Sequence, residues 1–133
     1  MAERQSYVAR HAACGAAARA GLAALGFELF ADPRHASDTI TAARLPDDLP
    51  WAEFNGALRT RGLILAGGQG ALTGKIFRIG HLGAVTVDEI LVALEMIEGV
   101  LLDRGRRVDR GAALVAALQA ADASRAERMA VSA

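Results

Sequence analysis

Hydrophobic and polar positions along the chain follow two periods, one typical of helices and one typical of strands. Residues 2–25 are dominated by alanine and contain no proline, and Gly26 follows them, so they predict one long helix. Further on, Trp51, Phe54 and Leu58 recur at helical spacing directly after a proline. This stripe predicts a second helix with one buried face.

Two more helices are predicted in the second half of the chain. Thr86 and Glu89 form a capping box, with the hydroxyl at the cap and the carboxylate three residues later, so a helix should begin there and end near Gly105. A last helix is predicted over residues 109–123. The tail 124–133 carries no stop signal, and we expect it to fray. We therefore expect one domain over residues 1–123.

Short runs of β-branched and apolar residues predict four strands between these helices, at residues 27–31, 39–45, 63–66 and 75–79. The strands are short and are interleaved with helices along the chain. This order predicts an α+β fold, in which a small antiparallel sheet is covered on one face by helices.

The last predicted strand carries an arginine among apolar residues. Because side chains alternate along a strand, Phe77 and Ile79 should face the helices while Ile76 and Arg78 face the other way. A guanidinium is a planar fork of donors that matches a carboxylate or a phosphate. Arg78 is either a binding group aimed by a rigid strand or a structural arginine paired with a local acid, and spacing alone leaves both possibilities open.

The loop before this strand is rich in glycine, with the sequence Gly67-Gly68-Gln69-Gly70. The whole connection is long for a hairpin, which favours a functional loop over a minimal turn. Its glycines serve either as turn residues only or as sites where a ligand or a partner chain approaches the backbone.

Composition excludes several classes of protein. Fifteen basic residues balance fifteen acidic ones, so the basic excess of a nucleic-acid-binding domain is absent, and the four arginines within residues 104–110 indicate a solvated turn. No apolar run is long enough to span a membrane, and the first residues do not resemble a signal peptide. The one cysteine, Cys14, is expected to be a buried side chain in a helix, and we expect a cytoplasmic protein.

Two other groupings of reactive residues are weak candidates for chemistry. His35, Ser37 and Asp38 lie within four residues on one loop, where a nucleophile, a base and an orienting acid can hardly reach the geometry of a triad. The three histidines, His11, His35 and His81, are scattered and lack nearby cysteine or acidic partners, so we expect no metal site.

Residues 67–70 (GGQG) and 74–83 (GKIFRIGHLG) resemble the C-terminal signature of class V aminotransferases. These are pyridoxal-phosphate enzymes of the alanine–glyoxylate and serine–pyruvate type. Residues 36–42 resemble an earlier strand of the same domain, and the likeness covers nearly the whole chain up to about Gly105. The resemblance implies the small C-terminal domain of a fold-type I aminotransferase.

The resemblance also implies roles for particular residues. In the family, the arginine of this strand binds the α-carboxylate of the amino-acid or oxo-acid substrate, which assigns that role to Arg78. Residues 67–70 would form the active-site loop. His81 follows the strand, and we give it no catalytic role. Lys75 matches a family lysine that does not hold the cofactor.

The family's larger domain precedes this one and supplies the Schiff-base lysine, the aspartate at the pyridine nitrogen and the phosphate cup. Lys75 is the only lysine of this chain, and nothing in it resembles the other two parts. Met1 would then begin partway through a longer polypeptide. We expect the complete enzyme to be a homodimer that uses pyridoxal phosphate to move an amino group from a small amino acid, such as alanine or serine, to glyoxylate or pyruvate. The chain alone should bind no cofactor and be inactive.

The alternative interpretation is a non-catalytic remnant that acts as a dimerisation or binding module. An in-frame catalytic domain encoded upstream of Met1 would favour the enzyme, and a stop codon there would favour the remnant. In both cases we expect an uncovered apolar face that promotes self-association.

Overall fold

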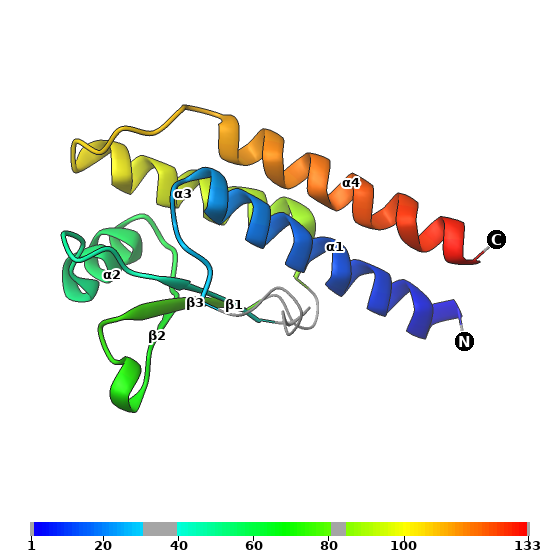
Figure 1. Ribbon diagram of the computed structural model, residues 1–133, viewed down its shortest axis with the longest axis horizontal. Helices are drawn as coiled ribbons and strands as arrows, with labels where there is room; N and C mark the ends of the chain where they lie inside the picture. The colour runs from blue at the N-terminus through cyan, green and yellow to red at the C-terminus, as the bar shows by residue number, and fades with distance from the viewer. Residues whose placement is uncertain (1, 31–39, 81–84, 133) are drawn as a thin grey trace.

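The computed structural model describes residues 2–30, 40–80 and 85–132. Its elements follow one another as one helix, one strand, a second helix, a strand, a short 3-10 helix, a third strand and two final helices (Figure 1). Their bounds are α1 (Ala2–Ala24), β1 (Ile40–Arg44), α2 (Trp51–Thr60), β2 (Ala66–Gly67), η2 (Gly70–Leu72), β3 (Ile76–Gly80), α3 (Val87–Asp103) and α4 (Ala112–Ser132).

The three strands form one antiparallel sheet in the order β1-β3-β2, so β3 is central and β2 lies at an edge. Helices α1, α3 and α4 lie together on one side of this sheet (Figure 1). On that side Ala43 and Phe77 are fully buried. On the other side Ile40 is 47% exposed and Ala66 is exposed. The predicted α+β fold, with helices covering one face, is confirmed.

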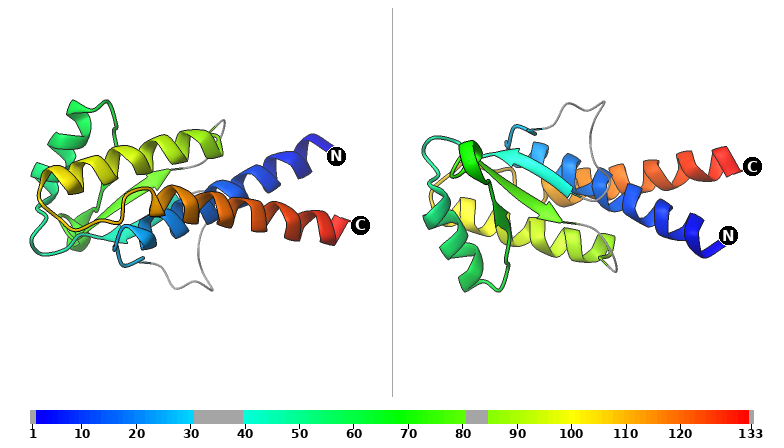
Figure 2. Two further views of the ribbon diagram at one scale, coloured as in Figure 1. Left: turned by 90° about the horizontal axis from the view of Figure 1, so that it is seen from above. Right: turned by 90° about the horizontal axis from the view of Figure 1, so that it is seen from below.

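Helices α1 and α4 run antiparallel, side by side, in all three views (Figures 1 and 2). Small residues make this close approach possible, because alanines of both helices are completely or almost completely buried in the core. These are Ala13, Ala17 and Ala18 on α1 and Ala113, Ala117 and Ala121 on α4. The alanine-rich composition therefore acts through packing as well as through helix propensity.

The predicted ends of two helices are confirmed by the glycines that follow them. Gly26 has φ 94° and Gly105 has φ 77°, a backbone conformation that residues with a Cβ rarely adopt. The capping box is confirmed as well: the Thr86 hydroxyl accepts a hydrogen bond from the Glu89 amide at 3.2 Å. The glutamate carboxylate lies 3.4 Å from the same hydroxyl.

Three predicted elements are wrong in extent. The strand predicted at 27–31 is reduced, in its described part, to a single bridge between Leu29 and Ala43. The strand predicted at 63–66 begins only at Ala66, because no strand of the described residues pairs with residues 63–65. The last helix, predicted to end near Ala123, continues as α4 to Ser132, although its described side chains beyond Ser124 are exposed.

Candidate substrate-carboxylate site

The central strand β3 positions Arg78 in the middle of the sheet. Its neighbours across the two ladders are Ala42 on β1 and Ala66 on β2. Both are small, so the long arginine side chain has room to lie across the sheet. Arg78 is half-buried and lies on the face opposite the helices.

The alternation predicted for β3 is present. Phe77 and Ile79 are buried in the helix-facing core, at 0% and 3% exposure. Ile76 shares the other face with Arg78, yet it is also buried, at 4%. The connection that contains Gly68 covers it: a Cβ built on Gly68 would lie 2.9 Å from Ile76 Cγ1.

Among the described residues, one hydrogen bond holds the Arg78 side chain. Its Nε donates to the carbonyl oxygen of Gly67 at 3.1 Å. Among the described residues, no carboxylate forms an ion pair with Arg78. Within the described residues the guanidinium is therefore held by a backbone carbonyl and has no ion-pair partner. Its binding of a substrate carboxylate stays a prediction.

The predicted active-site loop, residues 67–70, joins β2 to η2. A Cβ on Gly67 would lie 2.9 Å from Trp51 Cε2, and a Cβ on Gly68 would overlap the carbonyl oxygen of Leu72. Both positions therefore require glycine for lack of space. Gln69 caps η2 in an extended conformation. The role of the loop at an active site stays a prediction.

Lys75 immediately precedes β3, the strand that carries Arg78. It lines a hollow of about 670 Å³ together with Glu28, Arg44 and Asp47, and Arg78 does not line this hollow. The Arg44 guanidinium is 3.5 Å from the Glu28 carboxylate and lies over the ring of Phe30, 5.1 Å from its centroid. Since the only lysine of the chain lines a hollow that Arg78 does not line, the described residues do not by themselves fit a Schiff-base site for pyridoxal phosphate.

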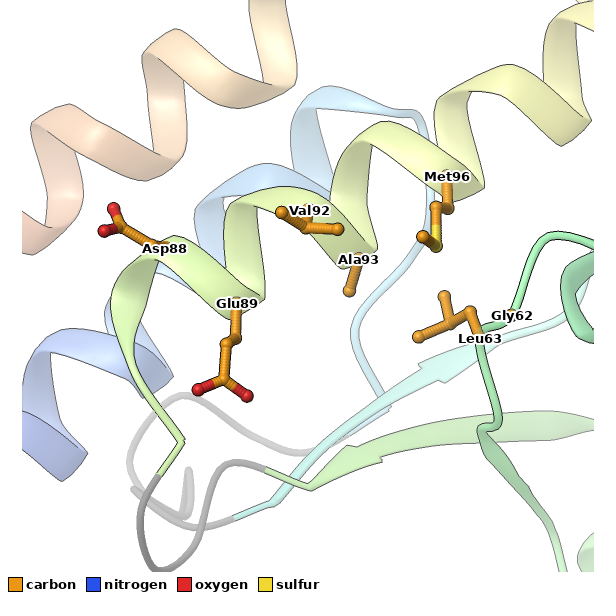
Figure 3. A pocket seen from close by; sticks show the side chains of 7 residues that line it. All are labelled: Gly62, Leu63, Asp88, Glu89, Val92, Ala93 and Met96. Atoms are coloured by element: carbon orange, nitrogen blue, oxygen red, sulfur yellow. The ribbon is translucent and has the colours of Figure 1, made fainter.

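A second hollow, of about 320 Å³, lies between α3 and the segment before β2. Leu63, Ala93 and Met96 face one another across it, with Glu89 at one end (Figure 3). Glu89 already serves the helix cap. The hollow is lined mainly by apolar residues of α3 and of the segment before β2, and Arg78 is not among them.

The arginines at the end of α3 and just after it form ion pairs with α2 and with the loop before α2. Arg104 reaches Glu53 at 2.9 Å and Arg106 reaches Asp48 at 2.8 Å. The hydrogen bond from Arg106 lowers the pKa of the Asp48 carboxyl. These partially exposed pairs fit the predicted solvated turn.

The remaining candidates do not converge on one place. His35, Ser37, Asp38 and His81 lie outside the described residues. His11 is buried on α1. Cys14 is buried as predicted, and its burial raises the pKa of the thiol. Within residues 2–30, 40–80 and 85–132, no group of histidine, cysteine and acidic side chains could hold a metal ion.

Sequence reasoning missed the place of Trp51 in this site. The helical spacing assigned it only to a buried stripe of α2, whereas its indole lies against Gly67, beside the carbonyl that holds Arg78. Sixteen positions separate Trp51 from Gly67, and no local pattern in the sequence links them.

Comparison with known proteins identifies relatives for most of the chain. It is 41% identical over 113 residues to an uncharacterized aminotransferase of Methanocaldococcus jannaschii, covering 84% of this chain and 29% of the relative. It is 38% identical over 119 residues to the pyridoxamine–pyruvate transaminase of Mesorhizobium japonicum, covering 86% and 30%. No family model matches the sequence.

A solved structure shows the same fold. The ureidoglycine–glyoxylate aminotransferase of Bacillus subtilis superposes with a TM-score of 0.78 at 32% identity, over 85% of this chain and 30% of that one.

The fold and the relatives together define an aminotransferase domain. The chain belongs to the class V aminotransferases and corresponds to their C-terminal small domain. It spans about three-tenths of the length of the curated relatives it matches. Pyridoxal phosphate is the cofactor of the complete enzymes of this family.

Among the described residues, no helix is both long enough and apolar enough to cross a membrane.

Proposed function

We propose that this chain is the substrate-clamping domain of an aminotransferase that moves an amino group from a small amino acid, such as alanine or serine, to a 2-oxo acid such as glyoxylate or pyruvate. In this proposal Arg78 binds the α-carboxylate that both substrates share. Residues 67–70 form the wall of the active site beside it. The complete enzyme acts as a homodimer.

The observation that carries the proposal is the state of the Arg78 side chain. Its Nε is held by a backbone carbonyl, and no acid of the described chain neutralises it. Alanines on both neighbouring strands leave the guanidinium uncrowded. A fixed, uncompensated guanidinium favours a planar anion, because two parallel hydrogen bonds can form at once.

The relatives support the size of the substrate. Their names state pyruvate as the acceptor of one transaminase and glyoxylate as the acceptor of the other. Both are small 2-oxo acids with a single carboxylate. One guanidinium is sufficient to recognise that carboxylate, and the rest of the substrate needs little space.

The cofactor belongs to the complete enzyme. When bound there, pyridoxal phosphate supplies the carbonyl group that carries the amino group between the two substrates. The residues of this chain would orient the substrate through its carboxylate and leave its amino or oxo group pointing at the cofactor. Because Lys75, the only lysine, lines a hollow that Arg78 does not line, the chain alone is proposed to be inactive and free of cofactor.

A chimera tests the role of Arg78. This chain would replace the corresponding part of the Mesorhizobium japonicum transaminase, and pyruvate-dependent turnover would be measured. We expect the chimera to be active and Arg78→Ala to lower kcat/KM by about 100-fold or more, as expected when a charge-assisted clamp is lost. Arg44→Ala is the matched control, because Arg44 lies on the same face of the sheet but is turned to Glu28. Equal turnover of the Arg78→Ala and Arg44→Ala chimeras would overturn the assignment.

The remnant hypothesis makes a different prediction for the chain alone. Ile40 and Ala66 are exposed on the open face of the sheet, and such a surface could join two copies without any catalysis. An inactive chimera whose isolated domain forms a stable dimer in sedimentation would favour that alternative.

A further inference from the structure

Trp51 lies against Gly67, the residue whose carbonyl oxygen accepts the hydrogen bond from Arg78. It is the first residue of α2 and is partly buried against the core. Its indole occupies the space that a side chain on Gly67 would need, since a Cβ there would lie 2.9 Å from Cε2 and 3.0 Å from Nε1. The position of Gly67 is therefore limited on one side by the indole.

Gly67 in turn holds the arginine. In the β2–β3 ladder the Gly68 amide donates to the Ile76 carbonyl at 3.1 Å. Antiparallel pairing alternates, so the preceding carbonyl, that of Gly67, points to the outer edge of the sheet, where no strand of the described residues pairs with it. The Nε of Arg78 donates to it at 3.1 Å. The arginine thus satisfies an edge-strand carbonyl and is fixed by it.

A line of aromatic rings connects the indole to β3 by a second route. Trp51 packs edge-on against Phe54 with the ring centroids 6.4 Å apart, and Phe54 packs in the same way against Phe77 at 5.3 Å. Both phenylalanines are fully buried. Phe77 directly precedes Arg78, so α2 fixes the arginine backbone through the core and the guanidinium through Gly67.

From these contacts we propose that Trp51 is a positioning residue that determines how Arg78 presents its guanidinium. Because Nε is used by Gly67, the two terminal nitrogens remain for the ligand. The carboxylate of the substrate is then bound end-on, in line with the arginine side chain, and not along its Nε side. This inference rests on the proposed function of Arg78 and adds the residue that aims it.

The hydrogen bond can be measured without any substrate. In ¹⁵N-labelled full chain, NMR follows the exchange of the Arg78 Nε proton with water. We expect Trp51→Ala to speed this exchange by about tenfold or more, because Gly67 is no longer held in place. Trp51→Phe should restore part of the protection. Phe30→Ala is the control, because it removes a ring that lies over Arg44 and leaves Arg78 unaffected.

A substitution at Gly67 tests the same contact from the other side. It does not depend on whether Trp51→Ala folds. Gly67→Ala alone should also speed the exchange, because its new methyl group overlaps the indole. Combined with Trp51→Ala, the same methyl group has space, so the double variant should exchange more slowly than Gly67→Ala alone. Additive effects, or exchange unchanged in Trp51→Ala, would overturn the proposal.

Activity then separates positioning from stability. In the chimera described above, Trp51→Ala should raise KM for pyruvate by about tenfold while kcat changes less, because an imprecisely aimed clamp mainly weakens binding. An unchanged KM would contradict the proposal. Failure of the proposed function looks different: Arg78→Ala would retain activity, whereas the exchange measurement would still report whether Trp51 holds Gly67.

Discussion

In the helix layer, α1, α3 and α4 meet through many small apolar contacts, whereas at the β2 edge of the sheet a few single contacts fix one side chain. The buried alanines of α1 and α4 show the first arrangement. The bond from Arg78 to Gly67, with Trp51 behind it, shows the second. Truncation of one side chain in the helix layer should therefore mainly lower the stability of the fold. At the sheet edge it should mainly change the orientation of Arg78.

The largest loss of stability is expected from Leu22→Ala. Leu22 is fully buried on α1, and its truncation leaves a cavity in the helix layer. We expect the free energy of unfolding to fall by about 2–5 kcal/mol, measured by urea denaturation followed by circular dichroism. Val8→Ala on the same helix, where the side chain is 44% exposed, should change it by no more than about 0.5 kcal/mol. Similar losses in both variants would show that this layer is not closely packed.

Gly68→Ala tests the sheet edge. The new methyl group would overlap the Leu72 carbonyl oxygen, so the connection has to move, and we expect a loss of about 1–3 kcal/mol in thermal unfolding. Gly56→Ala on α2 is the matched control. Nothing lies within 4 Å of its new methyl group, and the helix should gain about 0.5–1 kcal/mol. A shift of the melting temperature in the same direction for both substitutions would contradict the close contact between Gly68 and the Leu72 carbonyl oxygen.

Thr86→Ala removes one polar contact at the start of the helix layer. The Glu89 amide loses its acceptor, and α3 should lose about 1 kcal/mol of stability by chemical denaturation. Thr60→Ala is the control, since that hydroxyl only donates to the Gly56 carbonyl within the last turn of α2, at 3.0 Å. Its effect should stay within about 0.5 kcal/mol. The cap would be energetically irrelevant if the two losses were equal.

The smallest expected effect is a pH dependence from Cys14. Burial raises the pKa of this thiol, so the folded state holds its proton at a pH where the unfolded chain has released it. The stabilisation is complete below the ordinary thiol pKa of about 8.5 and declines as pH rises above that value. Urea midpoints of the protein should therefore fall more steeply above that pH than those of Cys14→Ala. Parallel curves would contradict a protected thiol.

The fold could be predicted where one local signal determined an element. Gly26 and Gly105 marked the ends of helices, and the Thr86–Glu89 pair marked a beginning, because caps act within one turn. Strands were less predictable, because a strand needs a partner. Residues 63–65 are apolar, yet no strand in the described part of the chain pairs with them, and Ile64 is 70% exposed.

The candidate site was predictable in part for the same reason. The alternation along β3 correctly assigned Phe77 and Arg78 to opposite faces. The partner of Arg78 is a backbone carbonyl, which no side-chain pattern reveals. The length of α4 was also underestimated, because its last turns continue without the buried stripe that identifies an amphipathic helix.

Trp51 is the only tryptophan of the chain, and it stands against the glycine whose carbonyl holds Arg78. Its ultraviolet emission consequently comes from one defined location and is sensitive to the polarity of that location. The domain carries a built-in optical reporter, so a ligand or a partner domain that rearranges the loop can be followed in solution without attaching a dye.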